Sequence, residues 1–188
     1  MNSPSPLISE PRFPPDLERE IFEICALSRP RTIPSLMLVA SRVKEWVEPL
    51  LYRIIAVSDS RNESLPPFTC DILVRTIRAK PVHFLAKYVR HLYLTPGRRN
   101  DREHVSDILP ACTGVTSLFT LWALHDAVFL TLLENMHSLR QLAVSVSSLF
   151  VPNNGFEHRL FRNITHLRPC RPSMCLLPRG RNYPISRI

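Results

Sequence analysis

The sequence is poor in glycine and contains none of the glycine-based motifs that bind phosphate or carry a hydrolase nucleophile. Four of its 188 residues are glycine, and the patterns G-x-x-x-x-G-K-[ST], G-x-G-x-x-G and G-x-S-x-G are all missing. Such loops need glycine because their backbone comes very close to a phosphate or turns sharply. We therefore expect no phosphate-cradling loop and no cofactor, and the sequence shows no catalytic motif.

The chain also has no long apolar run and no secretion signal. No stretch of about 18 apolar residues occurs, so we expect no membrane span and no membrane partner. The first residues, MNSPSPLISEPRF, lack the basic start and apolar core of a secretory signal. The five cysteines are odd in number and widely spaced, which favours a reduced compartment inside the cell, cytoplasmic or nuclear.

Residue types that could carry chemistry are present, but their patterns are weak. His166, Cys170 and Cys175 have the spacing of metal ligands, yet zinc would need a fourth ligand and a folded frame in a stretch dominated by Arg and Pro. His104 and Asp107 share one face of an expected helix and could form an acid–base pair. A solvated helix face is the simpler interpretation, so we expect neither a metal site nor a catalytic pair.

The net charge of +8 is concentrated at the C-terminal end. Five arginines and no acidic residue follow position 167, which leaves a net +3 for the rest of the chain. That tail, residues 168–188, also has four prolines and no periodicity, and we expect it to be disordered, like the lead-in at 1–12. The loop 98–102 is basic but lacks interleaved aromatic residues, so a nucleic-acid partner is not expected.

The middle of the chain, residues 53–167, repeats a strand–helix pattern. Arg53–Val57 is a β-branched run that predicts a strand. Four later segments each read aliphatic, polar, polar, leucine, and their leucines are Leu92, Leu118, Leu142 and Leu167, at steps of 26, 24 and 25 residues. Segments with helical spacing lie between them.

A repeat of about 25 residues resembles leucine-rich repeats, in which units too small to bury their own apolar faces stack on one another. No repeat shows the full leucine-rich consensus, so the array would be irregular. We therefore expect a mixed α/β or α+β chain, with a short strand–helix solenoid over 53–167. An ordinary α/β domain with coincidental spacing is the alternative.

The stretch from Phe13 to Tyr52 predicts two short helices. The first begins at Pro14-Pro15, where a missing N–H is tolerated, and ends near Ser28 because Pro30 follows. Its apolar stripe contains Leu17, Ile21, Ile24 and Cys25, while Phe22 points roughly 140° away from Leu17. The second helix begins at Thr32 to Ser35, and its main stripe is Leu36, Val39, Ala40, Val43, Val47 and Leu50.

Apolar residues on several sides give this stretch more apolar surface than two helices can cover. Four of them lie off the main stripes or at their edge: Phe22, Met37, Leu38 and Trp46. A unit of about 40 residues is also at the lower limit for folding alone. It therefore needs a second surface, either in the same chain or on a partner.

The same stretch resembles an F-box. The first half of the likeness is Phe13-Pro14-Pro15-Asp16-Leu17 followed by Ile21-Phe22, and the second half is Leu36, Leu38, Val39-Ala40-Ser41-Arg42 and Trp46. Phe13 stands where the family usually has Leu, and Asp16 where it usually has Glu. The ending from Glu45 to Arg53 is similar to F-box-like proteins of mushroom-forming fungi. The resemblance covers about 40 of the 188 residues.

The resemblance implies a docking role. An F-box binds a Skp-type adaptor of an SCF-type cullin–RING ubiquitin ligase, the repeats would present a surface to an unknown target protein, and other subunits would transfer ubiquitin. By position, the residues implied to bind the adaptor are Phe13, Pro14, Leu17, Ile21, Phe22, Leu36, Val39 and Trp46.

The alternative is a non-catalytic interaction or structural protein whose helical unit only caps its own repeats. Burial of four residues separates the two hypotheses: Phe22, Met37, Leu38 and Trp46. The alternative predicts that all four are buried within the chain. The F-box hypothesis predicts that several of them are exposed.

Overall fold

The chain divides into two compact units, Met1–Leu51 and Tyr52–Ile188. The computed structural model describes residues 13–57, 65–66, 68–95, 101–121, 127–145 and 159–170. The division lies one residue from the boundary expected after Tyr52. The lead-in 1–12 and residues 171–188, both expected to be disordered, lie outside the described residues.

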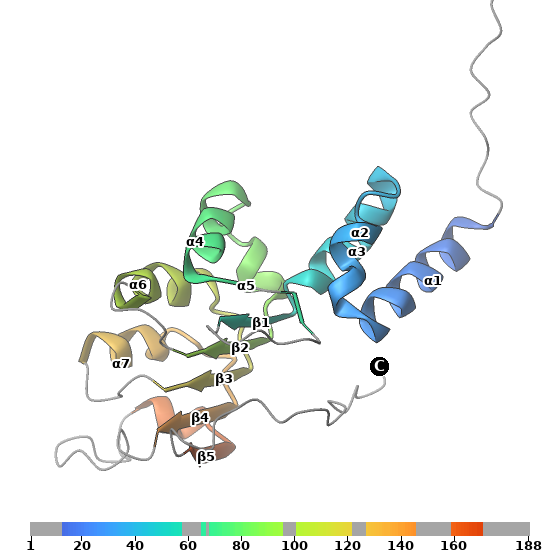
Figure 1. Ribbon diagram of the computed structural model, residues 1–188. Helices are drawn as coiled ribbons and strands as arrows, with labels where there is room; N and C mark the ends of the chain where they lie inside the picture. The colour runs from blue at the N-terminus through green and yellow to red at the C-terminus, as the bar shows by residue number, and fades with distance from the viewer. Residues whose placement is uncertain are drawn as a thin grey trace, which may run out of the picture. The chain divides into compact units, whose positions relative to one another are not determined.

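The first unit contains a long helix, α1, and a second helical segment that is broken. These elements are α1 (Pro15–Ser28), η1 (Pro30–Thr32), α2 (Ile33–Leu36) and α3 (Ser41–Leu51) (Figure 1). Pro15 occupies the first turn of α1, as expected, and the helix ends before Pro30.

The sequence predicted a single second helix, from Thr32–Ser35 to Leu50. That prediction is wrong, because α2 ends at Leu36 and α3 starts at Ser41. The N–H groups of Leu38 and Val39 reach back only three residues, to Ser35 and Leu36, at 3.2 and 3.1 Å. Hydrogen bonds that span three residues instead of four tighten the last turn of a helix, and they are common where a helix ends. The break turns Val39 out of the stripe that a continuous helix would form, and it is 60% exposed.

A small core holds the first unit together. Its fully buried residues come from α1, α2 and α3: Ala26, Ile33, Val43 and Val47. Partly buried side chains pack around them: Phe22, Leu36, Met37, Ala40, Trp46, Leu50 and Leu51. The side of α1 that faces this core therefore carries Phe22 and Ala26, one helical turn apart. It is not the side that carries the apolar stripe of Leu17.

The second unit is built on a parallel sheet, which confirms the expected α/β class. Its strands are β1 (Ile54–Val57), β2 (His91–Leu94), β3 (Ser117–Thr120), β4 (Gln141–Ser145) and β5 (His166–Cys170). They lie side by side in the order β1-β2-β3-β4-β5, every neighbouring pair parallel. The register places Ile55, Leu92, Leu118, Leu142 and Leu167 in one row across the sheet.

Strand β5 corrects one expectation at the C-terminal end. Residues 168–170, expected to be disordered, form the second half of β5 and pair with β4. Pro169 lies opposite Val144. Proline has no N–H and is confined to the edges of sheets, and β5 is the last strand in the strand order.

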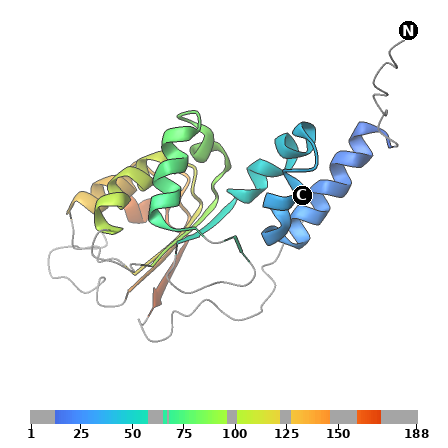
Figure 2. The same ribbon diagram turned by 45° about the horizontal axis from the view of Figure 1, so that its top comes forward.

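Helices connect the strands and cover one side of the sheet. They are α4 (Cys70–Ala79), α5 (Phe84–Tyr88), α6 (Asp101–Ala111), α7 (Ala127–Glu134) and η2 (Arg159–Asn163). Helix α4 packs on α6, α6 on α7 and α7 on η2, and Figures 1 and 2 show α4, α6 and α7 along the same face. The core lies between them and the sheet, so Leu92 and Leu94 of β2 are buried while His91 and Tyr93 are half-buried.

A ladder of backbone hydrogen bonds joins the residues that precede the strands. The carbonyl of Arg53 accepts the N–H groups of Arg90 and His91 at 3.0 and 3.1 Å, and the carbonyl of Arg90 accepts those of Thr116 and Ser117 at 2.9 and 3.1 Å. The same pattern continues from Thr116 to Arg140 and from Arg140 to Thr165. Each carbonyl uses both lone pairs, and the repeat seen in the sequence therefore recurs in the backbone.

Candidate docking surface

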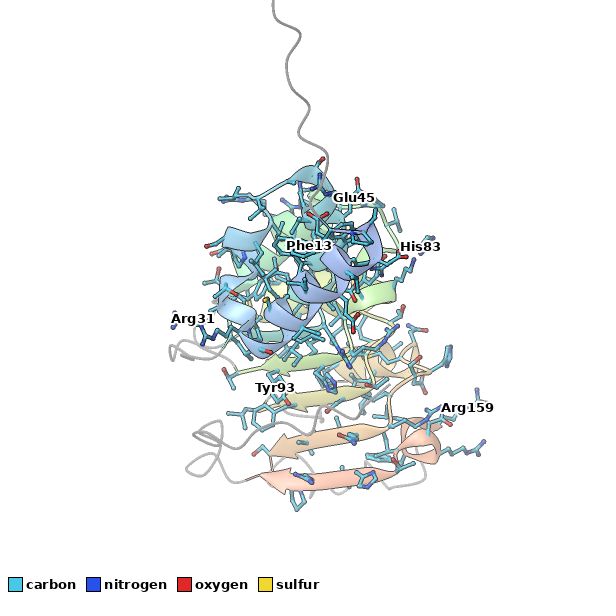
Figure 3. All side chains as sticks on the ribbon, turned by 90° about the vertical axis from the view of Figure 1, so that its right-hand side faces the viewer. Phe13, Arg31, Glu45, His83, Tyr93 and Arg159 are labelled. Atoms are coloured by element: carbon cyan, nitrogen blue, oxygen red, sulfur yellow. The ribbon has the colours of Figure 1, made fainter. Side chains whose placement is uncertain are left out.

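The first unit exposes a row of large aliphatic side chains on α1. Leu17, Ile21 and Ile24 follow helical spacing and are 50%, 47% and 55% exposed. Phe13, just before the helix (Figure 3), is 57% exposed. Apolar side chains exposed singly are normal, whereas a contiguous group of them marks a site of interaction. We call Phe13, Leu17, Ile21 and Ile24 the α1 row.

A second exposed group lies in the turn between α2 and α3. Leu38 is 87% exposed and Val39 is 60% exposed. The early end of α2 is the local cause, because a continuous helix would have kept Val39 on the same stripe as Leu36 and Val43. The turn instead presents both side chains to solvent.

An ion pair holds α1 against α3. The Arg42 guanidinium donates from Nη2 to Glu18 Oε1 at 2.8 Å and from Nε to Glu18 Oε2 at 3.1 Å. The pKa of Arg42 is raised, first by this hydrogen bond and then by the negative charge of Glu18. Two parallel bonds fix the direction of a guanidinium better than one. Glu18 follows Leu17 directly in α1, so the ion pair contacts the helix next to a residue of the α1 row.

The eight residues implied by the resemblance do not share one environment. Phe13, Pro14, Leu17, Ile21 and Val39 are exposed, whereas Phe22, Leu36 and Trp46 are partly buried against the core of the first unit. Ile24 was outside the implied set although it belongs to the α1 row. Its spacing after Leu17 and Ile21 was the signal in the sequence, because residues four and seven positions apart share a helix face.

The four residues whose burial distinguishes the two hypotheses do not share one environment. Leu38 is 87% exposed, but Phe22, Met37 and Trp46 pack partly buried on the core made by Ala26, Ile33, Val43 and Val47. These three therefore lie against their own helices. Among the described residues of the unit, the large apolar side chains that stay exposed are those of the α1 row and of the turn at Leu38 and Val39.

His104 and Asp107 do not form the acid–base pair that their spacing in the sequence allowed. His104 Nε2 lies 3.3 Å from Asp71 Oδ1 on α4 instead. Asp107 lines a shallow, open pocket of about 360 Å³ between α4 and α6, together with Val74, Ile77, Arg78, Ser106 and Pro110. The groups are on the surface, and the pocket is too open to hold a small molecule away from water.

Metal ligands and reactive thiols do not gather in the described part of the chain. No group of three or more His, Cys, Asp or Glu that could hold a metal occurs there, and Cys175 of the spacing considered from sequence lies outside the described residues. Burial raises the pKa of the Cys112 thiol to about 12, so it stays protonated. The basic loop 98–100 also lies outside the described residues.

None of the helices within the described residues combines the length and the apolar character needed to cross a bilayer. No family model, no curated protein and no solved structure matches the chain.

Proposed function

We propose that this chain is a non-catalytic docking protein: the substrate-recognition subunit of an SCF-type cullin–RING ubiquitin ligase. In this proposal the F-box-like unit binds a Skp-type adaptor, and the second unit holds a target protein. The observation that supports it is the α1 row, a line of exposed aliphatic side chains in the stretch whose sequence resembles an F-box. Such a complex would act in the cytoplasm or the nucleus.

The exposed row has the chemistry of an interface centre. Full burial of a Leu or Ile side chain contributes roughly 1.5–3 kcal/mol. Leu17, Ile21 and Ile24 are about half exposed, so a partner that covered them would gain on the order of 1 kcal/mol from each. The buried core of an interface is more apolar than its rim, so a group of aliphatic side chains that a partner covers fits such a core.

The second unit supports the part of the proposal that concerns the repeats. Parallel strands follow one another in sequence order, the leucines at steps of about 25 residues share one row, and the helices cover one face. Stacked strand–helix units produce this arrangement. We infer that the second unit is a short, irregular leucine-rich-repeat-like solenoid.

A second candidate remains, because three of the four separating residues are packed rather than exposed. Phe22, Met37 and Trp46 lie against the core of their own unit. This packing favours an interaction or structural repeat protein that binds no adaptor. The exposed α1 row supports the first candidate, because only that candidate gives these side chains a partner that would cover them.

The test is the affinity of the full-length chain for a Skp-type adaptor, measured by isothermal titration calorimetry. Ile21→Asp, at 47% exposure on α1, should weaken binding at least about tenfold, as loss of a central anchor does. Ile72→Asp, at 43% exposure on α4 of the second unit, is the matched control and should bind like the wild type. A folded wild-type chain that does not bind would leave the second candidate.

A further inference from the structure

The α1 row has two flanks of different kinds. Successive helix residues are about 100° apart, so the residues before and after Leu17 lie on opposite sides of it. On one side, Glu18 forms the ion pair that joins α1 to α3. On the other side are Asp16 and Glu20, which directly precede Leu17 and Ile21 and are both exposed. We call Asp16 and Glu20 the acidic flank.

The acidic flank carries charge that no partner within the chain neutralises. Helix α1 contains four acidic residues against one arginine, a net charge of −3. Glu18 and Glu23 pair with arginines at 2.8 and 2.7 Å. Asp16 and Glu20 form no ion pair within the described residues. The α1 row is therefore an apolar strip with unpaired negative charge along one side.

Helix stability explains only one of these two acids. Asp16 lies in the first turn of α1, where a negative charge stabilises the helix through its dipole. Glu20 lies beyond the first turn, and the effect of the dipole falls off within that turn. The negative charge of Glu20 beside the row therefore has no stabilising role within the helix end.

The sign of this flank is opposite to that of the chain as a whole. Residues 52–188 carry eighteen Lys and Arg against nine Asp and Glu, a net charge of +9, whereas residues 1–51 carry six against seven, a net −1. A partner attracted by net charge alone would be acidic and would bind the second unit. A partner that covers the α1 row meets negative charge instead.

The acidic flank separates the candidate occupants of the row. Nucleic acids and anionic lipid headgroups are negatively charged, so Asp16 and Glu20 would repel them. A second copy docked through the same row would bring together two helices that each have a net charge of −3. Like charges that meet across an interface lower affinity. A protein surface with basic residues beside an apolar groove complements both the row and its flank.

We propose that the α1 row binds an apolar groove on another protein, and that Lys or Arg residues at the rim of that groove lie against Asp16 and Glu20. The aliphatic side chains would supply most of the affinity, and the charges would steer the encounter and fix the orientation of α1. This inference rests on the proposed function where it gives the charge of the adaptor surface, but its main test does not require the adaptor.

The experiment measures fluorescence anisotropy of two labelled amphipathic peptides with the full-length chain at low ionic strength. Both peptides present a leucine stripe at helical spacing, which is bordered by Lys in the first peptide and by Glu in the second. The test variant is Asp16→Asn with Glu20→Gln. The control variant is Glu103→Gln with Asp107→Asn, two exposed acids of α6 at the same spacing. Both variants remove two negative charges.

The Lys peptide should bind the wild type at least about tenfold more tightly than the Glu peptide, although the net charge of +8 favours the opposite order. The test variant should bind the Lys peptide about fivefold more weakly, and this difference should vanish at high salt. The control variant should stay within about twofold of the wild type. Ile21→Gln, which removes an aliphatic side chain without adding charge, should weaken binding at high salt as well.

Equal weakening by the two double variants would show attraction to scattered negative charge and would overturn the proposal. So would tighter binding of the Glu peptide, no binding of the Lys peptide, or a dimer of the wild type that Ile21→Gln abolishes. A Skp-type adaptor is the second ligand. If it binds the wild type and the test variant equally, this proposal fails and the proposed function stands. If it does not bind the wild type while the Lys peptide behaves as expected, the proposed function fails and this proposal stands.

Discussion

Arg42 of α3 reaches Glu18 of α1 with two parallel hydrogen bonds, at 2.8 and 3.1 Å, across 24 positions of sequence. The pair joins the helix that carries the α1 row to the helix that carries Val43 and Val47 of the core. It lies on the same side of α1 as Phe22 and Ala26, which pack in the core of the unit. The row of Leu17 and Ile21 remains outside because Phe22, Ala26 and Glu18 occupy the inner side.

Arg42→Ala should lower the unfolding midpoint of the protein, with a loss that shrinks in high salt. The guanidinium is exposed, and salt screens exposed charges strongly. Lys44→Ala, an exposed change in the same helix, is the control and should have no comparable effect. Thermal unfolding at low and high ionic strength checks this. A midpoint that Arg42→Ala leaves unchanged at low salt would show that the ion pair does not contribute to stability.

Gly114→Ala should destabilise the second unit severely. A Cβ built at Gly114 would lie 1.9 Å from the carbonyl oxygen of Ala86 and 2.7 Å from Arg90 Nη1. The first contact is with backbone and cannot be relieved by a rotamer change, so we expect a loss of about 3 kcal/mol in the free energy of unfolding. Urea denaturation gives the value. Thr113→Ala, at the neighbouring half-buried position, is the control, and equal losses from both changes would contradict the steric explanation.

Truncation of a leucine in the row that crosses the sheet should lower the free energy of unfolding in proportion to how deeply that leucine is buried. Leu118 in β3 is 1% exposed, so Leu118→Ala should cost about 2–5 kcal/mol. Leu167 stands in the same row but is only half-buried in the edge strand β5, and Leu167→Ala should cost clearly less. Denaturant unfolding of both variants tests the gradient. Equal costs would mean that β5 is as well packed as the centre of the sheet.

Stability should fall at acidic pH through His91. Its pKa is lowered by burial and then by the charges of Arg53 and Arg90. The unfolded chain therefore binds a proton at a higher pH than the folded chain, and stability is lost as pH falls below the ordinary value of about 6.5. His91→Gln should flatten this part of the pH profile. A profile that keeps its slope in the variant would assign the effect to other groups.

The regular spacing of the leucines predicted the alternation of strands and helices in the second unit. Leu92, Leu118, Leu142 and Leu167 share a row because repeats of similar length bring equivalent residues into register. The contact of Gly114 with Ala86 could not be predicted in the same way. It brings helix α5 close to the turn after α6, 28 positions apart in the sequence, and nothing in the local pattern around either residue indicates it.

The first unit shows where periodicity stops being informative. Helical spacing placed Leu17, Ile21 and Ile24 on one stripe but could not say whether that stripe is buried. The buried side carries Phe22 and Ala26. These two residues form a less conspicuous apolar pattern in the sequence than Leu17, Ile21 and Ile24, but they pack against residues of α2 and α3. The break at Met37 to Val39 was missed for a similar reason, because the residues of the turn are all acceptable in a helix.

The affinity of the full-length Ile24→Asp variant for a Skp-type adaptor tests the central claim most directly. Ile24 is 55% exposed on the α1 row, and the family likeness alone did not include it among the contact residues. If the row docks the adaptor, the variant should fold like the wild type and bind at least about tenfold more weakly. Wild-type affinity in a folded Ile24→Asp variant would contradict the claim that this row is the docking surface.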